Sequence, residues 1–203
     1  MLYKNYVKRL IDILIGLLVI FFLWPVMLIV AIAIRIESPG PIIFRQERIG
    51  YKRKVFEIYK FRSMKTNSEH TGLGVYSNKN DSRVTKVGKI IRATSIDELP
   101  QVINMVKGDM SLIGPRPPLT YHPWPIEEYT NEQLHMFDVR PGITGWAQIH
   151  GRKDVEWHKR ILLNIWYVDH MSFRLDVIIF FRTIFKVLSN ADNENKGKTV
   201  NGD

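Results

Sequence analysis

The sequence predicts a mostly helical α/β protein with a small sheet and an N-terminal segment that enters a membrane. Three observations support this prediction. Residues 13–34 contain no charged side chain, residues 55–61 alternate as a strand does, and residues 155–188 repeat apolar side chains at helical spacing. A chain of 203 residues can bury a sizeable core in one domain beside such a segment.

The membrane segment has 22 residues. As one straight helix it would measure about 33 Å, enough to cross a bilayer core. Three interpretations compete. One is a cleaved signal peptide, since Ala31-Ile32-Ala33 resembles a cleavage site, although the apolar region is too long and basic residues follow closely. The others are a helix that spans the membrane and a re-entrant hairpin that enters and leaves on one face.

Pro25 lies almost at the midpoint of this segment, where a break would be needed to turn the chain back. Basic residues flank both sides: Lys4, Lys8 and Arg9 before, and Arg35, Arg45 and Arg48 after. Such symmetry gives a single span no clear orientation, but a hairpin satisfies the positive-inside tendency at both ends. Because a proline often only kinks a membrane helix, the pattern alone leaves hairpin and span equally open.

The net charge is +9, from 29 basic and 20 acidic residues, and it predicts an anionic partner: phospholipid, nucleotide or nucleic acid. The absence of cysteine excludes disulfides and thiolate metal sites. The sequence lacks a Walker-type phosphate loop, a dinucleotide glycine fingerprint, a histidine-pair zinc motif and a nucleophile-elbow serine. It therefore gives no support for the enzyme classes that those motifs define.

Residues 92–117 hold the candidate catalytic groups. Asp97 and Glu98 are adjacent carboxylates. Arg92 precedes Asp97 by five residues, and Arg116 follows between two prolines. Apolar residues from 99 to 106 recur at helical spacing and end at a glycine, a natural helix stop. Backbone N–H groups at a helix start, beside guanidinium groups, suit a bound phosphate, and a carboxylate placed there can attack phosphorus.

A structural role is the alternative for the same carboxylates. Ser95 followed by Glu98 three residues later has the pattern of a capping box, and acidic residues in a first turn complement the helix dipole. Pro100 argues against this, because with Ser95 as N-cap its ring would begin to clash inside the helix. A helix that starts at Pro100 would leave Asp97 and Glu98 on the preceding turn. The sequence leaves both interpretations open.

Residues 44–65 are strongly basic, and most of them are expected on a solvated or membrane-hugging surface. Lys60 and Arg62, at the end of the predicted strand, are the better candidates for contact with substrate. Arg140 precedes a proline in residues 138–146, which contain two glycines. That segment predicts either a second anion-facing loop or a structural turn.

The remaining segments have less specific patterns. Residues 67–83 predict a polar loop that can act as a lid, and residues 84–92 predict a short helix or strand. Residues 155–171 and 172–188 predict two helices, whose apolar faces lie either in a lipid interface or in the core. The last 15 residues, 189–203, are polar and predict a disordered tail.

Six ordered blocks of residues extend over nearly the whole chain. They are Lys8-Arg9-Leu10-Ile11-Asp12, Tyr59-Lys60-Phe61-Arg62-Ser63-Met64, Ser95-Ile96-Asp97-Glu98-Leu99-Pro100-Gln101, Lys107-Gly108-Asp109-Met110-Ser111, Gly114-Pro115-Arg116-Pro117 and Val139-Arg140-Pro141-Gly142-Ile143-Thr144-Gly145. In these blocks the sequence resembles the small monotopic phosphoglycosyl transferases, the bacterial sugar transferase family that starts glycan assembly on a polyprenyl carrier.

The resemblance implies roles for individual residues. Asp97 is expected to be the nucleophile, and Glu98 the acid–base group beside it. Mg²⁺ is expected near Asp97 and the substrate diphosphate. Arg92 and Arg116 stand at phosphate-contacting positions, and Lys60 matches the family's basic strand residue.

The resemblance also implies an architecture. Residues 1–36 are expected to form a re-entrant anchor broken at Pro25, residues 37–188 a catalytic domain at the membrane interface, and residues 189–203 a tail. The protein is then monotopic, with its catalytic domain on the cytoplasmic face of the bacterial inner membrane. Its exposed apolar helices leave room for a homo-oligomer.

The implied reaction transfers a sugar-1-phosphate from a UDP-sugar to polyprenyl (undecaprenyl) phosphate through a covalent aspartyl phosphosugar. The products are a polyprenyl-diphospho-sugar and UMP, in the first membrane step of polysaccharide or glycoconjugate synthesis. The partners are the UDP-sugar, polyprenyl phosphate and an anionic phospholipid bilayer, and no nucleic acid is expected. The alternative is a membrane-tethered basic module that binds anionic lipid or nucleic acid without catalysis.

The sequence departs from the family pattern at three positions. Trp24 stands where similar chains often have a small hydroxyl residue before the helix-breaking proline. Lys153 and Asn164 stand where related chains often have Asn and Asp. The last two changes lie outside the carboxylate pair, so they concern the sugar or nucleoside preference and not the type of reaction.

Overall fold

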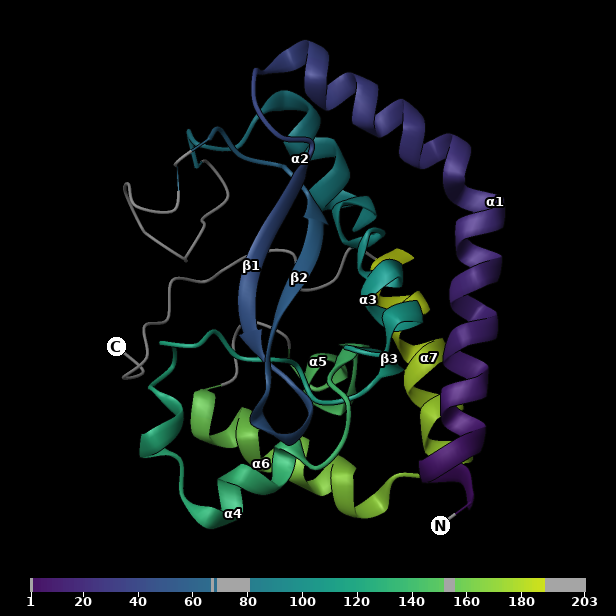
Figure 1. Ribbon diagram of the computed structural model, residues 1–203, viewed down its shortest axis with the longest axis vertical. Helices are drawn as coiled ribbons and strands as arrows, with labels where there is room; N and C mark the ends of the chain where they lie inside the picture. Colours follow the sequence, from purple (N-terminus) through teal and green to yellow (C-terminus); the bar gives the residue numbers. More distant parts are fainter. Residues whose placement is uncertain (1, 67, 69–80, 152–155, 189–203) are drawn as a thin grey trace.

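The computed structural model describes residues 2–66, 68, 81–151 and 156–188 as a mostly helical chain with two small sheets (Figure 1). Most of the predicted lid, residues 67–83, lies outside the described residues. The whole tail, residues 189–203, and Lys153 also lie outside them. The mostly helical α/β class with little sheet is confirmed.

Helix α1, Lys8–Glu37, contains the whole apolar segment, and a π-helical turn, Tyr3–Val7, precedes it. It is the one helix among the described residues that is long and apolar enough to cross a membrane. The helix continues through Pro25 and bends, as Figure 1 shows, and an internal proline is a usual cause of such a bend. The predicted hairpin is therefore not confirmed, because α1 bends but does not fold back on itself.

The N-terminal end of α1 is attached to the domain by polar side chains. Lys8 forms a buried ion pair with Asp176, Nζ to Oδ2 2.5 Å. Arg9 donates to two carbonyl groups at the C-terminal end of a later helix, α3 (Gln101–Lys107), at 2.5 and 2.8 Å. Asp12 accepts from the backbone N–H of Leu112 at 2.9 Å. Lys8, Arg9 and Asp12 thus attach the start of α1 to the rest of the domain.

The first sheet pairs β1, Ile43–Ile49, with β2, Val55–Phe61, in antiparallel register. A 3₁₀ turn, Tyr51–Arg53, joins the two strands. The strand predicted at residues 55–61 is confirmed, whereas β1 was not predicted. Its polar and basic alternation is that of a strand with one exposed face, and the charge density concealed it.

The second sheet pairs β3, Ser111–Ile113, with β4, Gly142–Thr144, in parallel. Two glycines of the β4 segment allow this close approach. A Cβ on Gly142 would lie 2.0 Å from the backbone N of Gly114, and one on Gly145 would lie 2.0 Å from the carbonyl O of Gly114. These contacts favour the structural interpretation of residues 138–146.

Two short helices flank the carboxylate pair. Helix α2, Lys86–Ala93, falls where a helix or strand was predicted, and helix α3, Gln101–Lys107, confirms the predicted apolar helix. Gly108 ends α3 with φ +100°, as expected for a glycine stop. The 3₁₀ turn η4, Ile96–Glu98, lies between the two helices.

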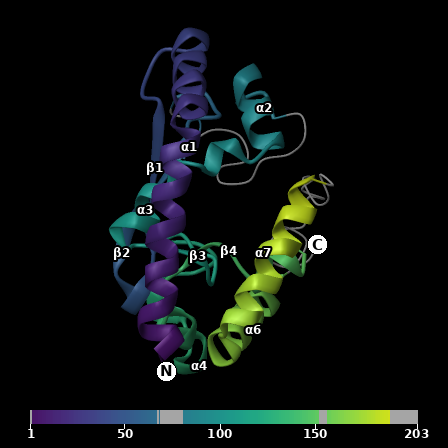
Figure 2. The same cartoon turned by 90° about the vertical axis from the view of Figure 1, so that its right-hand side faces the viewer.

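Apart from β3 and β4, the described elements of the C-terminal half are helices, and the last helix contacts both strands. The predicted helices are confirmed as α6, Trp157–His170, and α7, Phe173–Leu188. Shorter elements precede them: η5 Ile126–Glu128, α4 Asn131–Leu134, η6 His135–Phe137 and α5 Trp146–Ile149. Figure 2 shows that α1 and α7 meet near the N-terminus and diverge from there.

Candidate active site

The turn that carries the two carboxylates is separate from the helix that follows it. Ser95 has a left-handed backbone, φ +58°, and its side chain caps nothing. Helix α3 begins at Gln101, with Pro100 as its N-cap. The capping-box interpretation is therefore wrong. Asp97 and Glu98 lie on η4, before the first residue of α3.

Glu98 forms an ion pair with a side chain from the first sheet. Lys60, near the end of β2, donates from Nζ to Glu98 Oε1 at 2.7 Å. Both side chains are largely buried, with 19% of Lys60 and 25% of Glu98 exposed. Because a partly dry surrounding screens charges less than water does, this pair is stronger than a surface salt bridge.

Asp97 has an environment that opposes ionisation, and nearby cations partly offset it. Burial raises the pKa of the Asp97 carboxyl to about 6, and the charge of Glu98 acts in the same direction. The charges of Lys60 and Arg92 lower this pKa. A carboxylate whose pKa lies just below neutral is ionised at neutral pH and is a better nucleophile than an ordinary aspartate.

Arg92 presents an unused hydrogen-bond donor beside the carboxylates. It lies in the last turn of α2, and its Nη1 is buried without a hydrogen-bond partner among the described residues. An unpaired donor at a buried guanidinium is costly unless a ligand satisfies it. A phosphate oxygen is the acceptor that best matches a guanidinium group.

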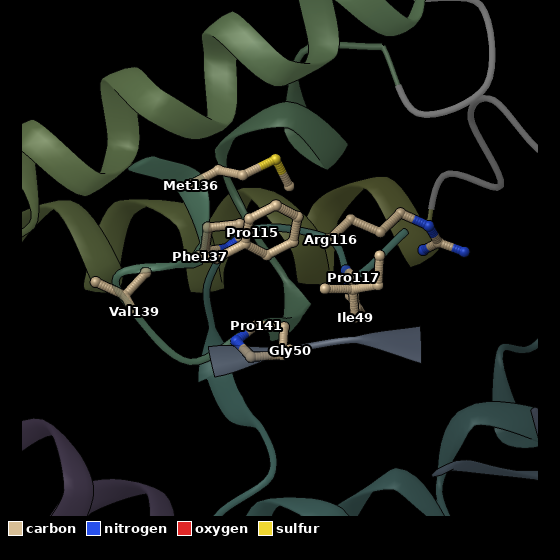
Figure 3. A pocket seen from close by; sticks show the side chains of 9 residues that line it. All are labelled: Ile49, Gly50, Pro115, Arg116, Pro117, Met136, Phe137, Val139 and Pro141. Atoms are coloured by element: carbon tan, nitrogen blue, oxygen red, sulfur yellow. The ribbon is translucent and has the colours of Figure 1, made fainter. Parts of the chain in front are cut away.

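Arg116 is held by its neighbours in the sequence but is free to contact a ligand. It lines a shallow pocket together with Ile49, Gly50, Pro115, Pro117, Met136, Phe137, Val139 and Pro141. Figure 3 shows its guanidinium group pointing away from those apolar side chains. Within the described part of the chain, Arg116 makes no hydrogen bond or ion pair, so no direct contact joins it to Asp97 or Glu98.

Arg62 and Arg140 have other partners in the fold. Arg62 is 5% exposed and donates to the carbonyl groups of Pro39 and Ser38, both at 2.7 Å. Arg140 donates from Nε to the carbonyl O of Gly108 at 2.9 Å, at the end of α3 remote from the carboxylates. Both contacts are of the kind that stabilises a fold. We therefore leave these two arginines out of the proposed phosphate site.

The carboxylate pair can supply ligands to a cation that arrives with a phosphate. Within the described ranges, no group of three or more His, Asp or Glu side chains is arranged to hold a metal ion alone. Mg²⁺ commonly binds one or two carboxylates together with substrate phosphates and water. Asp97, with its neighbour Glu98, fits that donor set.

Two of the departures from the family pattern lie far from the carboxylates in the sequence and differ in environment. Trp24 is 57% exposed on α1, and Asn164 is 2% exposed inside α6. Asn164 Oδ1 has no hydrogen-bond partner among the described residues. A neutral amide at this buried position avoids the cost of burying the charge that an aspartate would bring.

The pairing of Lys60 with Glu98 was missed by sequence reasoning, which offered Lys60 as a phosphate contact. The two residues are 38 positions apart, and no periodic pattern connects them. Their positions at a strand end and beside Asp97 were the signals present in the sequence. The structure shows that the end of β2 and the turn η4 meet.

Residues 3–190 match the model of the bacterial sugar transferase family. The chain therefore belongs to this family and is a transferase. It is 41% identical to the uncharacterized sugar transferase EpsL of Bacillus subtilis over 181 residues, which cover 89% of this chain and 87% of that protein.

Two other relatives are named for a specific reaction. One is the UDP-N-acetylgalactosamine-undecaprenyl-phosphate N-acetylgalactosaminephosphotransferase of Aeromonas hydrophila, 44% identical over 91% of this chain and 44% of that protein. The other is the UDP-glucose:undecaprenyl-phosphate glucose-1-phosphate transferase of Escherichia coli, 40% identical over 90% of this chain and 40% of that protein. The chain thus spans less than half the length of these two relatives.

Proposed function

We propose that this protein transfers a sugar-1-phosphate from a UDP-sugar to polyprenyl phosphate through a covalent intermediate on Asp97. The observation that supports this most directly is the surrounding of Asp97. Its carboxyl group has a pKa of about 6 beside Lys60 and Arg92, and Arg92 has a buried donor with no partner among the described residues. The relatives from Aeromonas hydrophila and Escherichia coli are named for transfer from a UDP-sugar to undecaprenyl phosphate.

In the first step, a carboxylate oxygen of Asp97 attacks the β-phosphorus of the UDP-sugar. The bond from that phosphorus to the bridging oxygen breaks, and UMP leaves with the electron pair. The sugar-phosphate then remains on Asp97 as an acyl phosphate. The guanidinium groups of Arg92 and Arg116 offset the repulsion between an anionic nucleophile and an anionic substrate.

In the second step, a phosphate oxygen of polyprenyl phosphate attacks the same phosphorus. The bond to Asp97 breaks, and the carboxylate leaves with the electron pair, so the product is a polyprenyl-diphospho-sugar. Glu98 accepts the proton of a singly protonated acceptor phosphate. Its ion pair with Lys60 holds the Glu98 carboxylate in place beside Asp97. Mg²⁺ held by Asp97 would neutralise charge on the diphosphate.

We place the site at the depth of lipid headgroups, because the acceptor phosphate carries a long lipid chain. In this proposal α1 enters the cytoplasmic leaflet of the bacterial inner membrane, bends at Pro25 and returns to the same face. The exposed side of α7 would lie in the interface, with apolar side chains beside basic ones. These exposed apolar side chains are Phe173, Val177, Ile178, Phe180, Phe181, Ile184 and Phe185.

The test is a screen for UMP release. The full-length protein in nanodiscs is incubated with Mg²⁺, polyprenyl phosphate and one UDP-sugar at a time, with N-acetylhexosamine, glucose and galactose donors. We expect UMP release that needs both substrates for full turnover with at least one donor. Release of UMP from none of them, together with salt-sensitive binding to nucleic acid, would instead support the non-catalytic basic module.

A further inference from the structure

The C-terminal end of α1 is joined to the helix that carries Arg92. Glu37, the last residue of α1, accepts hydrogen bonds from the first two N–H groups of α2. Its Oε1 lies 2.6 Å from the backbone N of Lys86, and its Oε2 lies 2.9 Å from the backbone N of Val87. Both carboxylate oxygens are thus used to cap α2 from 49 and 50 residues away.

Arg92 lies in the last turn of the same eight-residue helix. From residue 86 to residue 92 the helix rises only about 9 Å, so a small tilt at its N-terminus moves the guanidinium group at its other end. The N-terminal half of α2 also packs closely against another part of the chain. A Cβ on Gly88 would lie 2.0 Å from the carbonyl O of Ser63, so this turn already lies against the chain that follows β2.

Apolar packing joins the same part of α1 to the carboxylate turn. Val30 and Ile34 of α1 share a buried cluster with Ile91, the neighbour of Arg92, and with Phe61, the neighbour of Lys60. Ile96 and Leu99, which flank Asp97 and Glu98, pack against this cluster. The helix half that follows Pro25 therefore shares one apolar cluster with residues of α2, of β2 and of the segment around Asp97 and Glu98.

We propose that Glu37 is a positioning residue, which fixes α2 to the end of the membrane helix and thereby places Arg92 for the donor diphosphate. This rests on the proposed function and adds a residue outside the substrate-contacting set. In this arrangement the seating of α1 in the bilayer is coupled to phosphate binding through one carboxylate. Glu37→Gln tests it, because the amide keeps the length but retains one acceptor for two N–H donors.

Arg35→Gln is the matched control. Arg35 lies in the same last turn of α1 and donates to the carbonyl O of Gly40 at 2.9 Å. Like Glu37→Gln, Arg35→Gln removes one charge and weakens exposed hydrogen bonding at this helix end. None of the hydrogen bonds formed by Arg35 reaches α2 in the described residues, so a general effect of altering this helix end would occur in both variants.

The measurement is the Kd for UDP with Mg²⁺, which carries the diphosphate common to all donors, on full-length protein in nanodiscs. We expect Glu37→Gln to weaken UDP binding about three- to tenfold, and Arg35→Gln to leave it unchanged. In an Arg92→Ala background we expect Glu37→Gln to cause no further loss, because both changes remove the same contact.

Three outcomes would overturn the proposal: unchanged UDP binding by Glu37→Gln, an equal loss in Arg35→Gln, or a loss that adds in full to that of Arg92→Ala. A fall in thermal stability alone, with the Kd unchanged, would show that Glu37 only stabilises α2. These results are distinct from a failure of the proposed function, in which the unaltered protein itself would neither bind UDP nor release UMP.

Discussion

Lys60 and Glu98 form an ion pair of 2.7 Å that joins the end of β2 to the turn that carries Asp97. The pair places a positive charge beside Asp97, whose burial raises its pKa to about 6. The cation therefore does two things in this account. It fixes the orientation of Glu98, and it keeps Asp97 ionised at neutral pH.

Substitution of Lys60 by Met should shift the pH dependence of UMP release. Lys60 lowers the pKa of Asp97, so its removal raises that pKa and reduces the ionised fraction at any given pH. We expect the acidic limb of the kcat/KM profile to move to higher pH, with a loss of about 10- to 100-fold at pH 7. Lys54→Met, at an exposed position in the turn before β2, is the control. An unmoved acidic limb would contradict this role.

Asp97→Asn should stabilise the fold above pH 6. The folded-state pKa of Asp97 lies above its ordinary value of 3.8, so stability is lost as pH rises through about 6 and the buried carboxyl ionises. The amide avoids this loss, and we expect about 1–2 kcal/mol of relative stabilisation at pH 7.5, with little difference below pH 4. Thermal unfolding at several pH values measures it. A variant that is less stable at pH 7.5 would argue against the raised pKa.

Alanine substitutions of Arg62 and Arg116 should have different effects. The first should lower the stability of the fold, and the second should slow UMP release. Arg62→Ala removes three hydrogen bonds to Ser38 and Pro39 inside the protein, and should lower the free energy of unfolding by about 2–4 kcal/mol. Arg116→Ala should change stability by less than about 0.5 kcal/mol and slow UMP release at least about tenfold. The reverse pattern would exchange the two assignments.

Gly145→Ala should disrupt the parallel strand pair. The added methyl group would lie 2.0 Å from the carbonyl O of Gly114, and backbone atoms cannot move aside as a flexible side chain can. We expect a loss of about 2 kcal/mol or more, seen in chemical unfolding. Gly108→Ala provides a comparison, because this glycine has φ +100° and a Cβ on it would meet only the side chain of Arg9, at 3.2 Å. Unchanged stability of Gly145→Ala would contradict the close approach of the two backbones.

Local patterns were sufficient to predict much of the secondary structure. The alternation of residues 55–61, the apolar spacing before Gly108 and the periodicity of residues 155–188 gave helices and strands that the structure confirms. Strand β1 was hidden by its charges, and β3 and β4 are three residues each, too short for a periodic signal.

Contacts between distant residues were not predictable in the same way. No periodic pattern in the sequence relates Lys60 to Glu98 or Glu37 to α2, because each contact depends on how elements pack. The burial of Arg62 was also unreadable, since a charged residue in a basic stretch is normally exposed. The sequence could name the carboxylates and arginines. Only the packing shows that Arg62 and Arg140 donate to backbone carbonyl groups, whereas Arg92 Nη1 has no partner among the described residues.

The most direct measurement of the central claim is the mass of the protein after incubation with a UDP-sugar and Mg²⁺ in the absence of polyprenyl phosphate. We predict an increase equal to one sugar-phosphate, located by peptide mapping on Asp97, and removed when polyprenyl phosphate is added. Asp97→Asn should give no adduct and no UMP, whereas Lys54→Met should give both. Full UMP release by Asp97→Asn, or an adduct on another residue, would contradict the account.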